Sequence, residues 1–134
     1  MNQISVKGIL LGALSAYIVS KILGLPILLY LTSKIGTPPS TAFGLIHFNK
    51  ILLAEAVINL MSAVIGGYIA AFIAKKNELL NGALSSFLAL GLGVFSWFSS
   101  YPLTNGKYWW FLVLATYPLF SLFGGHLRLK QVRK

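Results

Sequence analysis

The sequence predicts an all-α integral membrane protein, built as a bundle of four transmembrane helices. Hydrophobic residues make up 57% of the chain and charged residues only 10%, whereas a soluble domain carries about 25% charged residues. The mean hydropathy is +0.80. Four apolar runs are each roughly 20 residues or longer, enough to cross a bilayer core of about 30 Å as a helix. In lipid these runs must be helical, because every backbone N–H and C=O needs a partner within the protein.

The length suits one transmembrane domain, residues 1–134, without a separate soluble domain. The expected spans cover about 8–31, 51–74, 80–101 and 108–127. Pro26 and Pro118 fall inside the first and fourth spans, where they predict kinks rather than breaks. A tight link at Lys75–Glu78 joins the second and third spans, and Asn105-Gly106 is a turn signal between the third and fourth. The first connection, residues 33–50, is longer, and the sequence does not define its role.

The basic residues at the ends of these runs predict the orientation. One side of the membrane would hold Lys7, Lys75, Lys76, Arg128, Lys130, Arg133 and Lys134. The other side would hold only Lys34, Lys50 and Lys107. Because cytoplasmic loops are enriched in Lys and Arg, the first side is expected to be cytoplasmic, with both termini inside. The net charge of +9 is therefore explained by topology and anionic headgroups, and no nucleic-acid partner is expected.

Two short matches predict an internal repeat. Gly12-Ala13-Leu14-Ser15 opens the first span, and Gly82-Ala83-Leu84-Ser85 opens the third. Gly66-Gly67 lies near the end of the second span, and Gly124-Gly125 near the end of the fourth. The bundle is therefore expected to consist of two tandem transmembrane hairpins in the same orientation, related by an axis along the membrane normal.

A resemblance appears in IGGYIAAFIAKKNELLNGALSSFL, residues Ile65 to Leu88. This segment, about a fifth of the chain, is similar to one found in small bacterial four-span membrane proteins of unknown function. The shared features are a Gly-Gly pair ending the second span, a short basic link, and a Leu-Leu-x-Gly start to the third. The resemblance implies a four-span protein of the bacterial inner membrane, and it implies no activity.

Small residues at helical spacing mark where the helices should pack closely, because lipid tails are as apolar as Leu and helices in lipid associate through close backbone approach. In the first span Gly8, Gly12, Ala16 and Ser20 recur every fourth residue. The remaining expected packing positions are Gly66, Gly67, Gly82, Ser86, Gly93, Gly124 and Gly125.

The second span also carries a polar face. Glu55, Asn59 and Ser62 are spaced by four and three residues, so they share one side of the helix. Lys21 is the expected charged partner of Glu55, since its estimated depth lies within about 9 Å and an unpaired charge at mid-depth costs about 2.5–3.5 kcal/mol. Three interpretations stay open: Glu55 pairs structurally with Lys21, it binds a proton, ion or substrate, or it reaches the outer headgroups.

The residue types that the chain lacks limit the kinds of function that it can have. The chain has no Cys and no Asp, and His47 and His126 are expected on opposite membrane faces, so no metal site, cofactor or catalytic triad is predicted. We therefore expect a non-enzymatic inner-membrane protein that self-assembles or serves as an accessory subunit of a membrane complex. The alternative is a small oligomeric channel or proton- or ion-coupled transporter that uses Glu55, Asn59 and Lys21. A polar face sealed inside one bundle would favour the structural role, and one facing a neighbouring subunit would favour transport.

Overall fold

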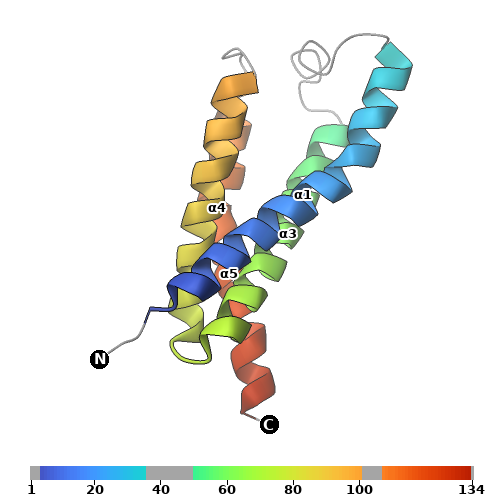
Figure 1. The fold of residues 1–134 in the computed structure, drawn as a ribbon. Coiled ribbons are helices and arrows are strands. Elements are labelled where there is room, and N and C mark those ends of the chain that lie inside the picture. Colours follow the sequence, from blue (N-terminus) through green and yellow to red (C-terminus); the bar gives the residue numbers. More distant parts are fainter. Residues whose placement is uncertain (1–3, 36–49, 101–106, 134) are drawn as a thin grey trace.

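The structure is a computed structural model that describes residues 4–35, 50–100 and 107–133. These residues form four long helices, which confirms the all-α prediction (Figure 1). In chain order they are α1 (Val6–Ile35), α3 (Lys50–Ala74), α4 (Glu78–Ser100) and α5 (Lys107–Val132). Pro26 and Pro118 lie inside continuous helices, as expected. Glu78 was predicted to belong to the link, but it is the first residue of α4.

Three helices are long and apolar enough to cross a membrane. Within the described residues, the qualifying segments are Val6–Ile27, Leu53–Ala74 and Glu78–Phe95. This finding supports the predicted membrane class for α1, α3 and α4. The same criterion does not select the described part of α5, although that helix is 26 residues long.

The helices are arranged as two hairpins that share one end. Both chain termini and the α3–α4 link lie at the lower end in Figure 1, and the helix pairs α1–α3 and α4–α5 diverge toward the upper end. The α3 helix makes the most extensive contacts, above all with α1 and α5, although α4 also contacts each of the other three helices. Most helix contacts therefore depend on which residues α3 presents to its neighbours.

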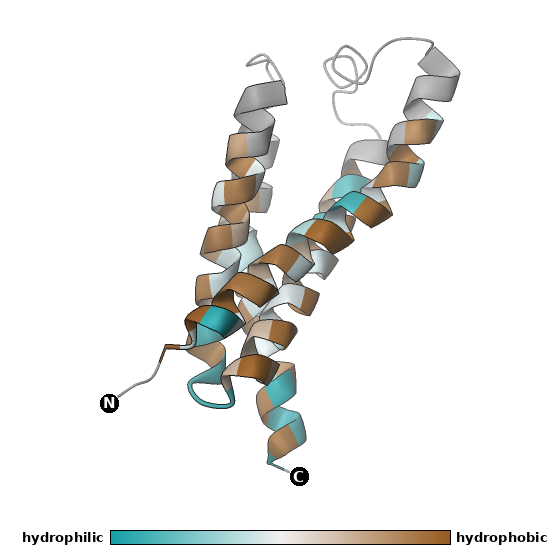
Figure 2. Cartoon of the chain, in the orientation of Figure 1, coloured by the Kyte–Doolittle hydropathy of each residue, from teal (hydrophilic) through white to brown (hydrophobic). Residues whose placement is uncertain are grey.

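The packing is inverted relative to a water-soluble protein. The buried apolar residues are almost all alanines, joined by Tyr117: Ala13, Ala16, Ala56, Ala63, Ala70, Ala71 and Ala89. Large apolar side chains point outward instead, with Phe95 76% exposed and Leu119 62% exposed. Figure 2 shows hydrophobic residues along most of each helix, with hydrophilic residues at the end that holds the termini and again where the middle of α1 meets the upper part of α3. Small residues inside and large apolar residues outside are what lipid-embedded helices require.

The first crossing joins α1 and α3 almost backbone to backbone. A Cβ atom added to Gly12 would lie 2.6 Å from the Gly66 carbonyl oxygen and 2.6 Å from the Ala70 Cβ. One added to Gly8 would lie 2.8 Å from the Ala70 carbonyl oxygen, and one added to Gly66 would lie 2.7 Å from the Ala16 Cβ. Only glycine fits at these three positions without a shift of the neighbouring helix.

The second crossing joins α3 and α5 even more closely. A Cβ atom on Gly67 would overlap the Ser121 carbonyl group, and one on Gly124 would overlap the Val64 carbonyl oxygen. The two glycines therefore allow the α3 and α5 backbones to touch.

The third crossing joins α4 and α5. A Cβ atom on Gly82 would lie 3.2 Å from the Ser121 carbonyl oxygen, and one on Gly125 would lie 3.1 Å from the Glu78 carbonyl oxygen. The Ser121 hydroxyl donates to the Gly82 carbonyl oxygen at 2.6 Å, so this contact carries a buried interhelical hydrogen bond. Such a bond adds to close packing in holding helices together in lipid.

The small-residue ridge of α4 ends earlier than expected. Ser86 is buried, and its hydroxyl donates to the Ala83 carbonyl oxygen of its own helix at 2.5 Å. Ala89 is also buried. Gly93, in contrast, is exposed and would place an added Cβ in open space within this chain. The packing role of Gly93 therefore stays a prediction, since among the described residues the buried part of the ridge extends as far as Ala89.

A buried asparagine ties the lower end of the bundle together. Asn81 of α4 is completely buried. Its side-chain oxygen accepts a hydrogen bond from the Ser5 backbone N–H at 2.8 Å, and its amide group donates to the Lys76 and Asn77 carbonyl oxygens at 3.0 Å each. Ser5 in turn caps α1, because its hydroxyl accepts from the Gly8 N–H at 3.1 Å. One side chain thus links the start of α1 to the α3–α4 connection.

The α3–α4 connection reverses the chain with two left-handed residues. Lys75 has φ of 56° and Asn77 has φ of 49°. Asn adopts this conformation with little strain, whereas for Lys it is uncommon. The Asn81 bonds to the carbonyl oxygens of Lys76 and Asn77 hold the connection in this tight form.

Candidate functional site

The polar face of α3 lies against α1 and is hydrogen-bonded within the chain. The Ser20 hydroxyl of α1 donates to the Asn59 side-chain oxygen at 2.6 Å. The Asn59 amide group donates to the Glu55 backbone carbonyl oxygen at 2.9 Å, and the Ser62 hydroxyl donates to the Asn59 backbone carbonyl oxygen at 2.7 Å. Asn59 therefore has partners on both its oxygen and its nitrogen.

The polar contacts continue from α3 to α5. Ser62 is completely buried, and it is close enough to interact with Tyr117, whose ring lies in the core with Ala63 and Ala89. Hydrogen bonds join Ser20 of α1 to Asn59 and Ser62 of α3, and the contact between Ser62 and Tyr117 extends this polar group to α5. A buried tyrosine hydroxyl normally needs such a partner, because an unpaired polar group costs free energy in a dry interior.

The expected Glu55–Lys21 pair is placed nearby but does not form a close ion pair. The Glu55 side chain is partly buried in the second turn of α3, and the Lys21 ammonium is near enough to interact with it electrostatically. Among the described residues, no ion pair within 4.0 Å joins the two. The Lys21 ammonium lies over the Tyr17 ring instead, 5.4 Å from its centroid.

The rotation of α1 explains this difference. Ser20 continues the ridge formed by Gly8, Gly12 and Ala16, so Ser20 faces α3 and bonds Asn59. Lys21 follows by one residue, about 100° farther around the helix, and its side chain is exposed. Charge and estimated depth correctly placed Lys21 near the level of Glu55. The residue of α1 that contacts α3 at this level is Ser20, however, and not Lys21.

Three polar features were not foreseen from the sequence. Asn81 and its bonds at the lower end were missed, because a polar residue early in a span is also typical of an interfacial position. The Tyr68 hydroxyl donates to the Gln131 side-chain oxygen at 2.7 Å, which links α3 to the end of α5. The Arg128 guanidinium lies 4.6 Å from the centroid of the Phe72 ring. No spacing rule in the sequence connects these pairs.

The described residues offer hydrogen bonding rather than covalent or metal chemistry. Within that part of the chain, no group of three or more His, Cys, Asp or Glu side chains could hold a metal ion. His126 is exposed in the last turns of α5, and His47 lies outside the described residues, as do the side chains of Trp97, Trp109 and Trp110. The site is best described as a polar connection between three helices with one partly buried carboxylate at its edge.

Comparisons with protein-family models, curated proteins and solved structures find no match to this chain.

Proposed function

We propose that this chain is a non-enzymatic integral membrane protein of the bacterial inner membrane that assembles with further copies of itself or with a larger complex. The main support for a membrane location is the inverted packing, with small residues inside and large apolar residues outside. Alanine, glycine and serine fill the helix contacts, while Leu, Ile and Phe side chains cover the outside. In water this surface would be a very large exposed apolar patch, whereas in lipid it is the solvated surface.

The proposal includes α5 as a fourth span, with both termini in the cytoplasm. A helix of 26 residues is about 39 Å long at 1.5 Å per residue, which exceeds the hydrocarbon core. Its close contacts with α3 and α4 support the same depth. Arg128 and Lys130 near its end lie at the same end of the bundle as Lys75 and Lys76, which supports a cytoplasmic location for that end.

We further propose that the two hairpins form a parallel repeat. The α1–α3 hairpin crosses at Gly12 and Gly66, and the α4–α5 hairpin crosses at Gly82 and Gly125. Each crossing uses a glycine from the Gly-Ala-Leu-Ser segment and one from the Gly-Gly pair. Similar residues making similar contacts support an origin by duplication.

Assembly with another chain is supported by the position of Lys21. This exposed cation lies in the middle of α1, far from either helix end. A lysine facing hydrocarbon near mid-depth costs about 2.5–3.5 kcal/mol on insertion scales. Contact with a second membrane chain would remove the ammonium from lipid and supply a hydrogen-bond acceptor. Native mass spectrometry from mild detergent should then detect a homo-oligomer or a co-purifying complex, and a strictly monomeric protein would contradict the assembly proposal.

Transport remains the second candidate, and one observation favours it. The Glu55 carboxylate is partly buried at membrane depth and has no close ion pair with Lys21, and ionisable residues at such depth mark proton and ion pathways in many transporters. Against it, Asn59 and Ser62 are occupied by hydrogen bonds inside one chain. Hydrogen bonds within the chain support the structural role more strongly, and Glu55 and Asn59 are partly buried.

Substitution of Glu55 separates the two roles. If the Glu55 charge offsets that of Lys21, Glu55→Gln should lower the midpoint of thermal unfolding in detergent by roughly 2–5 °C, because one charge of the pair loses its counter-charge. A second change, Lys21→Met, should restore part of that loss. If Glu55 carries a proton or cation, the Glu55→Gln protein should keep its stability and lose flux in reconstituted vesicles. A variant with unchanged stability, assembly and flux would contradict both roles and leave the headgroup interpretation of Glu55.

A further inference from the structure

A hollow lies at the lower end of the bundle, outside the polar face of α3. It has a volume of about 480 Å³ and is bordered by the α3–α4 link, the start of α4 and the end of α5. Its lining includes the apolar residues Leu79, Leu129 and Val132 together with the charged residues Glu78 and Arg133. An apolar wall with a few charged groups suits an amphipathic ligand better than a fully soluble one.

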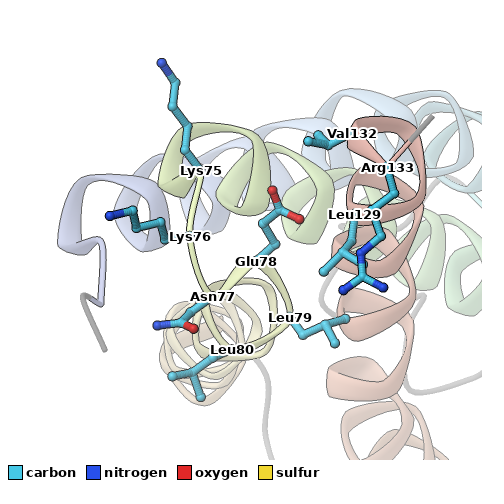
Figure 3. A pocket seen from close by; sticks show the side chains of 9 residues that line it. All are labelled: Lys75, Lys76, Asn77, Glu78, Leu79, Leu80, Leu129, Val132 and Arg133. Atoms are coloured by element: carbon cyan, nitrogen blue, oxygen red, sulfur yellow. The ribbon is translucent and has the colours of Figure 1, made fainter. Parts of the chain in front are cut away.

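Of the four charged residues that line the hollow, Glu78 and Arg133 come from different helices and have opposite signs. Figure 3 shows Glu78 rising from the start of α4 and Arg133 reaching in from the end of α5, with the Leu129 and Leu79 side chains near the guanidinium. Glu78 is only 9% exposed, yet no ion pair within 4.0 Å joins it to Arg133 among the described residues. Both side chains therefore keep free hydrogen-bonding capacity toward the hollow.

Close packing explains how the two charges come to share this space. Gly125 lets α5 approach the first turn of α4, since an added Cβ would lie 3.1 Å from the Glu78 carbonyl oxygen. Arg133 follows Gly125 by about two turns and so lies beside the same part of α4. Lys75 and Lys76 stand at the rim and extend away from the hollow in Figure 3, so they raise the local positive potential without occupying it.

We propose that this hollow binds the headgroup of a zwitterionic aminophospholipid, of the phosphatidylethanolamine class. The primary ammonium of the headgroup would donate hydrogen bonds to the Glu78 carboxylate, and its phosphate would accept from the Arg133 guanidinium. The acyl chains would lie along Leu79, Leu129 and Val132. The inference rests on the proposed membrane location, which places this end at the cytoplasmic headgroup layer.

The placement of Glu78 argues against other phospholipids. The carboxylate is one of only two acidic residues in the chain. The cations Lys75, Lys76 and Arg133 would attract the phosphate of any phospholipid, but only a headgroup with a primary ammonium also supplies hydrogen-bond donors to Glu78. A choline headgroup carries a quaternary ammonium without N–H groups, so it cannot donate to Glu78. A soluble phosphoethanolamine would gain nothing from the apolar wall.

The test is competitive lipid binding by the full chain in mild detergent. Phosphatidylethanolamine, phosphatidylcholine and phosphatidylglycerol with identical acyl chains are offered in equal amounts, and bound lipids are counted by native mass spectrometry. We expect the ethanolamine lipid to be preferred over the choline lipid by roughly fivefold, the upper range for one partly exposed charge pair. Glu78→Gln should abolish this preference and Glu78→Asp should retain most of it, whereas Arg133→Gln should weaken binding of all three lipids.

The control is Lys130→Gln, which removes the same charge from the same helix without touching the hollow. It should leave the ethanolamine preference unchanged. Preference for phosphatidylglycerol, equal binding of all lipids, or displacement by free glycerophosphoethanolamine at equal concentration would each overturn the proposal. Recovery of the protein in the soluble fraction would instead overturn the proposed membrane function, so the two failures are distinguishable.

Discussion

The Gly67→Ala variant should lose about 3 kcal/mol or more of stability, because its new methyl group would overlap the Ser121 carbonyl group at the α3–α5 crossing. Backbone atoms cannot rotate away as a flexible side chain can, so α3 and α5 would have to separate. That separation would also strain the bond between the Ser121 hydroxyl and the Gly82 carbonyl oxygen. Thermal unfolding in mild detergent, followed by the loss of the monodisperse chromatographic peak, measures the effect.

Gly91→Ala is the matched control for this substitution. Gly91 also lies in a helix, but an added Cβ there would meet nothing within 4 Å. Its melting temperature should be unchanged or slightly raised, since alanine has the higher helix propensity. Equal melting temperatures for Gly67→Ala and Gly91→Ala would contradict the close α3–α5 crossing. If Gly67→Ala cannot be purified but Gly91→Ala is obtained in normal yield, the loss of the Gly67→Ala protein is still explained by the disrupted α3–α5 crossing.

Asn81→Leu should be the next most damaging change, at about 3 kcal/mol. Leucine has the same branched shape, but it cannot replace the bonds to the Ser5 N–H and to the Lys76 carbonyl oxygen, whereas the Asn77 carbonyl oxygen keeps the Asn81 backbone N–H as a partner. Each backbone group left without a partner in the interior costs about 1–3 kcal/mol. The same unfolding measurement applies, and backbone hydrogen exchange should show faster exchange at the start of α1.

Ser86→Ala tests whether any buried polar residue of α4 would give the same result. Ser86 is as well buried as Asn81, but its hydroxyl donates only to the Ala83 carbonyl oxygen of its own helix. That carbonyl group keeps its place in the helix when the hydroxyl is removed, so the loss should be well below 1 kcal/mol. A loss as large as that of Asn81→Leu would show that burial alone, and not the link to α1, accounts for the effect.

The sequence predicted the helices and most of their contacts for a physical reason. Close helix packing in lipid depends on residue size, and the size of each residue follows directly from its type. Gly12, Gly66 and Gly67 could therefore be identified as packing positions before their partners were known. Gly93 satisfied the same spacing rule, but an added Cβ there would meet nothing within 4 Å among the described residues. The spacing of small residues shows which face of a helix is small, and it does not show how far a neighbouring helix extends along that face.

The polar contacts were predicted less well, because they depend on helix rotation and register. Lys21 was the expected partner of Glu55 from charge and depth, yet Ser20 is the residue that bonds α3. A rotation of one residue about α1 decides between them, and the ridge of Gly8, Gly12 and Ala16 fixes that rotation. The ridge expected from the sequence already included Ser20, but nothing in the sequence paired Ser20 with Asn59. The long-range bond of Asn81 could not have been found this way, since its partner is a backbone N–H at the start of another helix.

The central claim is that four helices span the membrane with both termini in the cytoplasm, and cysteine labelling tests it most directly. The chain has no Cys, so single substitutions Lys76→Cys, Asn105→Cys and Lys130→Cys can each be labelled without background. With a membrane-impermeant maleimide on intact spheroplasts, only the Asn105→Cys protein should react. The Lys76→Cys and Lys130→Cys proteins should react only after lysis. Labelling of Lys130→Cys in intact spheroplasts would show that α5 does not return to the cytoplasm and would contradict the four-span account.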